Sequence, residues 1–462
     1  MDIKNIKTIS FVPPSNKDTA LKQSLVEKVA ISRLPPVNLS YDSVKIFVEK
    51  TCSSMLKLNT GNLYNLFRLC LEQAPSEAIF GYSEQNGFSI SALNKRGFSF
   101  SSSFWVKIKP EKVELYSGLK DKVELGRGTY KTVIGGMQAT VPKQSDRSKL
   151  LEISSGSCAL SQIAYGESRS VSQGIQMHKE ILKIPGTDPY FVALPCLEVR
   201  SRETLEMLVD PYYHGSLEKA VSNRSIPQEM GSLKRISLST TDFIRFSKNL
   251  TEGVRLLGEN QVFHKDIKLD NIRMKVGKDG VVNALIGDFD LTSKESLSWS
   301  QSDYLYWNKA CSIGYASAET DRFGLVLAIA RMLLCEGEAI SNEASFYERI
   351  SLNSESERAC LWQKYQGSMK KDSFDKVFDL LKKTLESDDQ VGNSLQVQIA
   401  EVEKSSQLPA NSIKRYRAPA LSREEINVYT ALLQERAPKA LQEYPIPSIA
   451  EINDVLNHLE IR

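Results

Sequence analysis

The chain has 462 residues, 41% of them hydrophobic and 25% charged, a composition that is typical of a globular protein and argues against disorder or a fibrous repeat. The 59 lysine and arginine residues nearly balance the 56 aspartate and glutamate residues, so the charge indicates neither a nucleic-acid partner nor an anionic membrane. The seven cysteines include no C-x-x-C pair and the four histidines are dispersed, which argues against a disulfide framework and a structural zinc site.

The sequence lacks the usual patterns of export and membrane insertion. Residues 1–17 contain no apolar stretch of signal-peptide length, and no later apolar run approaches about 20 residues. We therefore expect no membrane segment, and a protein that works in its own cytoplasm or in a host cytosol reached without the Sec route.

Residues 1–115 are the first of two predicted regions. They contain two Pro-Pro pairs and a serine-rich stretch, mixed with helical patterns over 43–58 and 61–73. From Lys112 onward, β-branched residues and glycines replace this pattern, as expected for strands joined by tight turns. We predict an N-terminal extension of mixed helical character over 1–115, of unknown function, and a second domain over 116–462.

Helical patterns dominate after Met230. Apolar residues recur at three-to-four spacing over 242–260, and the stretch 325–334 is apolar on nearly every face, which predicts a buried helix. Between these helices, residues 272–290 have the pattern of two strands around the turn sequence GKDG. Strands followed by helices, with one hairpin among the helices, predict an α+β protein with two lobes.

Two short motifs carry the most chemical information. Residues 264–271 have the sequence HKDIKLDN, and residues 288–290, directly after the hairpin, have the sequence DFD. Either motif alone is equally compatible with a solvated loop or an ordinary strand end. In this order and spacing they resemble the catalytic loop H-R-D-x-x-x-x-N and the metal-binding motif D-F-G of the protein kinases. The resemblance implies a bilobal fold, with a β-rich N-lobe and a helical C-lobe, that uses ATP with Mg²⁺ or Mn²⁺.

The resemblance implies a role for each matching residue. Asp266 would be the catalytic base that accepts the hydroxyl proton, and Lys268 would contact the γ-phosphate. Asn271 and Asp288 would hold the metal ions, and His264 would be architectural. Phosphoryl transfer needs such positioning and charge neutralisation more than covalent help from the protein, which explains these residue types.

Upstream, residues 125–133, with the sequence LGRGTYKTV, resemble the glycine-rich loop of the kinases, where small residues let backbone N–H groups approach phosphate. The resemblance implies that Gly126, Gly128 and Val133 bind the nucleotide. Lys131 replaces the third glycine, which stiffens the loop but offers a cation to phosphate. A plain hairpin is the alternative interpretation.

Residues 207–217 resemble the strand, hinge and helix start that connect the kinase lobes. In that resemblance, backbone groups near Asp210 and Tyr212 contact adenine. The alternative is a strand that leads into a capped helix without any nucleotide.

The kinase lysine that pairs with ATP phosphates and with a helix glutamate is hard to place. We assign it to Lys143, with Lys149 as the competing choice, and we assign its partner to Glu180. Either lysine is equally compatible with a surface position, and Glu180 with a solvated helix face.

The C-terminal half extends the resemblance. Asp321 opens an apolar helix like the kinase core helix, whose first aspartate holds the catalytic-loop backbone. Residues 373–388 and 447–460 resemble two late kinase helices, which implies an insertion at about 388–440.

Three departures from the family pattern stand out. Lys265 replaces an arginine and lacks its bidentate fork, so control by activation-loop phosphorylation is doubtful. Asp290 replaces the glycine of D-F-G, which removes backbone freedom and adds negative charge. The activation segment over about 291–319 is short. With the extension and insertion, these features are typical of a divergent eukaryotic-like kinase, such as a bacterial effector kinase.

The sequence therefore predicts a kinase that transfers the γ-phosphoryl group of ATP to serine or threonine hydroxyls of a protein substrate. Three alternatives remain: a pseudokinase that binds nucleotide or partners without turnover, nucleotidyl transfer on the same fold, and a protein whose activity resides in residues 1–115.

Overall fold

The computed structural model describes part of the chain, and all structural statements below concern that part. It comprises residues 27–30, 79–83, 87–89, 103–108, 112–118, 124–127, 131–142, 150–201, 204–230, 233–277, 279–294, 317–336, 343–406, 431 and 435–462. Helices and strands are both abundant, so the protein belongs to the α+β class, as predicted. The chain divides into two units: the first comprises residues 1–171, 193–212 and 230–232, and the second comprises 172–192, 213–229 and 233–462.

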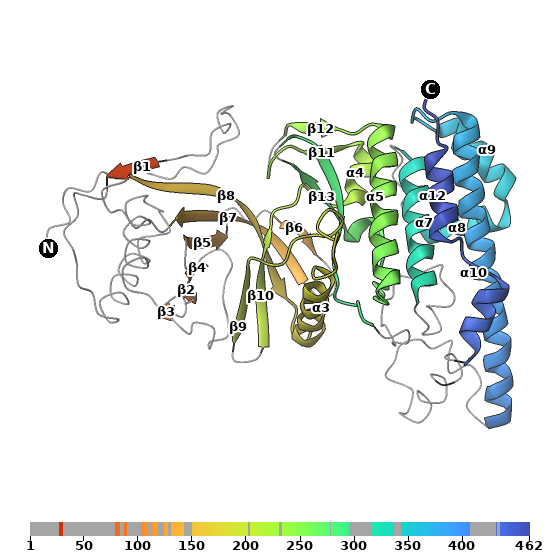
Figure 1. The fold of residues 1–462 in the computed structure, drawn as a ribbon, viewed down its shortest axis with the longest axis horizontal. Helices are drawn as coiled ribbons and strands as arrows, with labels where there is room; N and C mark the ends of the chain where they lie inside the picture. The colour runs from red at the N-terminus through yellow and green to blue at the C-terminus, as the bar shows by residue number, and fades with distance from the viewer. Residues whose placement is uncertain are drawn as a thin grey trace. The chain divides into compact units, whose positions relative to one another are not determined.

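The first unit is built on one antiparallel sheet of ten strands (Figure 1). Eight strands lie in the order β3 (Gly87–Ser89), β2 (Ile79–Ser83), β4 (Ser103–Ile108), β5 (Lys112–Gly118), β7 (Lys131–Pro142), β8 (Leu150–Ile163), β10 (Thr204–Pro211) and β9 (Leu197–Ser201). The short β1 (Glu27–Ala30) pairs with β8, and β6 (Glu124–Arg127) pairs with β7.

The long strands β7 and β8 pair with each other along most of their length. Lys131 lies opposite Ile163 at one end of this pairing, and Thr140 lies opposite Ser154 at the other. The core of this unit gathers apolar side chains from β5, β7, β8, β9 and β10: Tyr116, Ile134, Cys158, Leu160, Leu197, Val199, Met207 and Val209. Strands from distant parts of the sequence thus share one hydrophobic layer.

The predicted boundary between residues 115 and 116 falls inside β5. This strand pairs with β4 on one side and with β7 on the other, so described strands before and after the boundary belong to one sheet. Lys107 of β4 also donates a hydrogen bond of 2.7 Å from its Nζ to the carbonyl of Cys196. The two predicted helical stretches, 43–58 and 61–73, lie outside the described residues.

The second unit is mainly helical. It contains the part of α3 (Ser168–Ile181) from residue 172 onward, α4 (Leu217–Asn223), α5 (Thr240–Glu259), α7 (Ala318–Leu334), α8 (Glu343–Leu352), α9 (Ser354–Lys364), α10 (Lys371–Ser406) and α12 (Ile449–Asn457). Two small hairpins, β11 (Ser225–Pro227) with β12 (Arg235–Ser237) and β13 (Ile272–Val276) with β14 (Val282–Ile286), accompany these helices.

Helices α5 and α7 form the centre of the second unit. A capping box between Ser239 and Asp242 starts α5, whose apolar residues Phe243 and Phe246 are fully buried. Helix α7 is buried along nearly its whole length, which confirms the prediction from its apolar sequence. Its one buried cation, Arg331, contacts Glu218 of α4 at 3.2 Å. The two helices pack directly on each other and provide a rigid base.

The hairpin predicted around the GKDG turn is confirmed. β13 pairs with β14 from Ile272 opposite Ile286 to Val276 opposite Val282. Gly280 has a φ of 82°, a left-handed conformation that glycine adopts without a steric penalty. The hairpin therefore brings residues 271 and 287, at its two ends, next to each other in space.

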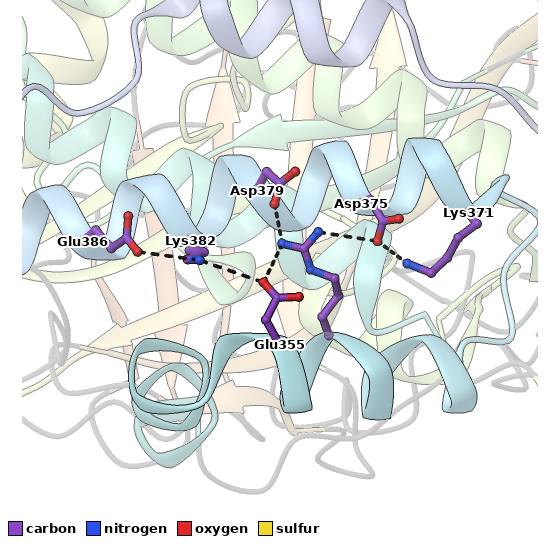
Figure 2. A network of polar contacts seen from close by, with 7 residues as sticks. Glu355, Lys371, Asp375, Asp379, Lys382 and Glu386 are labelled. Carbon is purple, nitrogen blue, oxygen red and sulfur yellow. Dashed lines mark hydrogen bonds and ion pairs between the residues drawn. The ribbon is translucent and has the colours of Figure 1, made fainter.

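Ion pairs join α9 to α10 on the surface (Figure 2). Arg358 of α9 contacts Asp379 at 2.5 Å and lies over the ring of Phe378, 4.7 Å from its centroid. Lys382 lies 4.0 Å from both Glu355 and Glu386, at the limit of an ion pair. Helix α10 continues without interruption through residue 388, where the predicted insertion begins.

None of the helices in the described part of the chain combines the length and the apolarity needed to cross a bilayer.

Candidate active site

The loop between α5 and β13 is held by a buried carboxylate. Asp321, in the first turn of α7, accepts hydrogen bonds of 2.7 Å from the backbone N–H groups of His264 and Lys265. Burial raises the pKa of Asp321, an effect that its interactions with His264 and Lys265 oppose. One side chain thus fixes two consecutive peptide groups of the loop.

Three of the predicted site residues come together on this loop. The Asp266 carboxylate accepts hydrogen bonds from Nζ of Lys268 at 3.0 and 2.8 Å, and from Nδ2 of Asn271 at 2.7 Å. The same Nδ2 also donates to the Asp266 carbonyl at 2.9 Å. Asp266 is only 9% exposed. The loop therefore presents a carboxylate, an ammonium group and an amide within direct contact of one another.

His264 joins this loop to the segment that carries Asp288. Its Nδ1 accepts a hydrogen bond from the Asp266 N–H at 3.3 Å, so the neutral ring carries its proton on Nε2, which lies 3.1 Å from the Gly287 carbonyl. The Gly287 N–H donates to the Asn271 carbonyl at 3.0 Å. Asp288 is the next residue along the chain.

Several residues here have unusual backbone conformations. Among the described residues other than glycine, positive φ occurs at Gln261 (54°), Lys265 (69°), Asp288 (66°) and Arg224 (49°). Three of these four lie between residues 261 and 288. Side chains other than glycine rarely adopt this region, and such strain is concentrated at functional sites.

The segment that follows Asp288 is tied back to the loop. Ser293 and Phe263 exchange two backbone hydrogen bonds, of 3.1 and 2.9 Å. Lys265, which is 2% exposed, contacts the hydroxyl of Ser293 at 2.5 Å through its Nζ. The predicted activation segment continues through residues 295–316, which lie outside the described residues.

The residues predicted to bind nucleotide in the glycine-rich loop and the hinge belong to the first unit. Gly126 of β6 lies opposite Val133 of β7, and Val133 lies opposite Ser161 of β8. The Ser161 hydroxyl donates a 2.8 Å hydrogen bond to the carboxylate of Asp210, at the end of β10. Tyr212 follows β10 and is partly buried. Gly128 lies outside the described residues.

Sequence reasoning missed Ser161. The only signal was a polar residue directly after the buried apolar run CAL, and Ser161 is itself 2% exposed. No lysine or arginine occurs in β8, so its described residues offer no cation beside Val133.

The structure describes one member of the predicted pair of Lys143 and Glu180. Lys143 lies outside the described residues and directly follows Pro142, which lies about 30 Å along β7 from Val133 at ordinary strand rise. Glu180 forms an ion pair of 2.7 Å with Lys183, which lies just after the end of α3. Hydrogen bonding to Lys183 lowers the pKa of Glu180. Lys149, the alternative lysine, also lies outside the described residues.

The chemistry of the loop fits a hard cation. Nδ2 of Asn271 is engaged twice with Asp266, so its carbonyl oxygen is the amide atom left to act as a ligand. An amide oxygen together with the carboxylate of Asp288 is the kind of donor set that Mg²⁺ prefers. Among the described residues, no group of three or more His, Cys, Asp and Glu side chains gathers in metal-binding geometry.

The geometry of this loop is the basis for assigning a function, because comparison with known proteins gives no match. No family model matches the sequence, and no curated protein matches it significantly.

Proposed function

We propose that this protein is an ATP-dependent protein kinase with a bilobal kinase-like fold. The observation that carries the proposal is the arrangement of Asp266, Lys268 and Asn271, in direct contact on a loop whose backbone is fixed by Asp321. Asp288 follows a glycine that is hydrogen-bonded to Asn271. Two motifs that resemble those of the kinases thus lie together at one place in the second unit.

In this proposal Asp266 orients a serine or threonine hydroxyl of a protein substrate and accepts its proton during transfer. Lys268 balances negative charge beside that carboxylate. Asn271 and Asp288 would hold Mg²⁺ or Mn²⁺, which would neutralise the charge of the transferring phosphate. His264 keeps the loop and the Asp288 segment in register through its two ring nitrogens.

The proposed nucleotide-binding residues are Gly126, Gly128, Val133, Asp210 and Tyr212. The pairing of Gly126 with Val133, and the link from Ser161 to Asp210, support a common surface within the first unit. The backbone groups near Asp210 and Tyr212 would contact adenine, and those near Gly126 and Gly128 would bind the phosphates.

One observation favours a pseudokinase as the second candidate. β8 carries Ser161 in its buried run and contains no lysine or arginine, while Glu180 is engaged with Lys183. Without a cation from β8, such a site would neutralise less of the negative charge of the nucleotide phosphates. Nucleotide binding without transfer would then be the function of the fold.

Transfer of label from γ-labelled ATP to a generic acceptor protein, with Mg²⁺ present, tests the proposal. We expect Asp266→Asn and Asp288→Asn to lower the rate by about 10²-fold or more, because each removes a charge from the transfer step. Asp270→Asn is the matched control, since Asp270 is an exposed acid on the same loop. If wild-type protein binds ATP but transfers no label, the pseudokinase becomes the better proposal. A product heavier by AMP would instead indicate nucleotidyl transfer.

A further inference from the structure

A lysine of strand β4 holds the chain just before β9. Nζ of Lys107 donates a 2.7 Å hydrogen bond to the carbonyl of Cys196, and the two residues lie 89 positions apart in the sequence. Strand β9 begins at the next residue, Leu197. A side chain from the N-terminal strands, upstream of the region that resembles the kinases, thus reaches the opposite end of the sheet.

This hydrogen bond requires the sheet to curve. In the order of the strands, β4 and β9 are separated by five spacings, which amount to about 24 Å at roughly 4.8 Å each and exceed the reach of one lysine side chain. Tyr116 of β5 also belongs to the same buried cluster as Leu197 and Val199 of β9. The sheet therefore bends around this core until β4 meets the start of β9.

Buried polar groups accompany Lys107 at this meeting point. Glu114 lies opposite Lys107 in the pairing of β4 with β5, is 2% exposed and accepts a 2.8 Å hydrogen bond from the Tyr116 hydroxyl. Burial raises the pKa of Tyr116, and its hydrogen bond to Glu114 and the neighbouring Cys196 raise it further. Opposite charges on directly opposed residues stabilise a strand pair, so Lys107 has a defined place from which to reach Cys196.

The backbone of Cys196 connects Lys107 to the end of β10. Its N–H donates a 2.6 Å hydrogen bond to the Val209 carbonyl, where the pairing of β9 with β10 ends. Asp210 is the next residue along β10, and its carboxylate accepts the hydrogen bond from Ser161 of β8. The end of β10 is thus held between β8 on one side and the backbone that Lys107 fixes on the other.

We propose that Lys107 is a positioning residue for nucleotide binding, through which strands β4 and β5 set the place of the β10 end near Asp210 and Tyr212. This inference rests on the proposed function, in which the backbone there contacts adenine. Without the ammonium group, the Cys196 carbonyl loses this donor, and the end of β10 is held less tightly on the side of β9. The N-terminal strands thereby contribute to the affinity for nucleotide.

Lys107→Met is the decisive substitution, because it removes the ammonium group and keeps an unbranched stem. We expect the Kd for ATP, measured by titration calorimetry without acceptor, to rise by roughly tenfold, as the loss of one hydrogen bond from a charged donor predicts. The KM for ATP in label transfer should rise by a similar factor. The kcat at saturating ATP and the KM for the acceptor should not change, because the substitution acts through the end of β10.

Lys107→Arg should restore most of the affinity, since a guanidinium group can donate to the same carbonyl. Arg169→Met is the matched control, because Arg169 is an exposed cation of the same unit, and its Kd for ATP should equal that of the wild type. If Lys107→Met does not fold, Lys107→Gln takes its place, because glutamine is neutral, polar and one atom shorter than lysine.

Hydrogen exchange of residues 196–201 and 204–211, without nucleotide, gives a readout independent of activity. We expect faster exchange there in Lys107→Met, and exchange like that of the wild type in Lys107→Arg and Arg169→Met. An unchanged Kd for ATP, or unchanged exchange, in the folded Lys107→Met or Lys107→Gln variant would overturn the inference. If the wild type binds ATP but transfers no label, the kinase proposal has failed, and the Kd values still decide whether Lys107 positions the nucleotide site.

Discussion

The loop over residues 262–293 and the sheet around β7 and β8 hold their backbones by different means. In the loop, buried polar side chains reach single peptide groups, as Asp321 does for His264 and Lys265. In the sheet, order comes from long ladders between strands that are far apart in sequence, such as β5 with β7. The loop should therefore be sensitive to single polar substitutions, and the sheet to the loss of whole strands.

The largest effect is expected from removing residues 1–115. This truncation deletes β4, cuts β5 in half and removes Glu114, whose carboxylate accepts a 2.8 Å hydrogen bond from the buried Tyr116 hydroxyl. We expect the first unit to lose about 5 kcal/mol or more, comparable to the whole stability of a small domain. Limited proteolysis and hydrogen exchange of β7 measure this loss.

A chain that begins at residue 79 is the control, since it retains strands β2 to β5. In this chain, β7 should resist proteolysis and hydrogen exchange far better than in the chain that lacks residues 1–115. Equal protection of β7 in both would show that the sheet does not depend on its N-terminal strands.

The next effect concerns the loop. Asp321→Ala leaves the buried N–H groups of His264 and Lys265 without their acceptor, and we expect the second unit to lose about 3 kcal/mol or more. Asp321→Asn keeps one acceptor oxygen and should lose less. Hydrogen exchange of α5 measures both. Equal, small losses in the two variants would contradict the assigned role of Asp321.

A pH-dependent effect is expected at a second buried carboxylate. Glu336, at 2% exposure, accepts a 3.0 Å hydrogen bond from Thr240 and lies 3.6 Å from Nη2 of Arg224. Burial raises the pKa of Glu336 above its ordinary value, an effect that Arg224 and Thr240 oppose. The folded protein thus holds this proton more tightly than the unfolded chain does. The stabilising contribution is therefore full below about pH 4.5 and is lost as the pH rises through the folded pKa.

Comparison of wild type with Glu336→Gln isolates this effect. Between about pH 5 and about pH 8, the wild type should lose more free energy of unfolding than the variant, as measured by urea unfolding at each pH. Glu348→Gln, at an exposed glutamate of α8, controls for general charge effects. Parallel pH profiles for wild type and Glu336→Gln would rule out the contribution of Glu336.

The smallest effect is expected at the surface contact between α9 and α10. Arg358→Ala removes the ion pairs to Asp379 and Glu355 and the contact with Phe378, and we expect a loss of about 1 kcal/mol. Lys382→Ala should change the free energy of unfolding by less, because its ion pairs are 4.0 Å long. Urea unfolding of both variants tests this order. A loss of several kcal/mol at either residue would contradict it.

The sequence was informative where structure is local. The motifs over 264–271 and 288–290, the hairpin between them and the buried helix α7 all depend on residues close in the chain, and the structure confirms the hairpin and the burial. The place of Ser161 opposite Val133 depends on strand register, which one sequence does not reveal. The hydrogen bond from Lys107 to the Cys196 carbonyl depends on the curvature of the sheet, so neither residue carried a signal of its own. The continuation of one sheet across residue 115 was missed for the same reason as Ser161.

The division of the chain into units has a consequence for how the protein folds during synthesis. The first unit is discontinuous in sequence, because residues 172–192 belong to the second unit and the last sheet strands are β9 and β10. Its sheet also joins Glu27 of β1 to Ile153 of β8. Such long-range pairing slows folding, and the sheet cannot close before residue 211 has left the ribosome. Until then, the edge of β8 that pairs with β10 is exposed to other chains, so a chaperone that shields strand edges should raise the yield of folded protein.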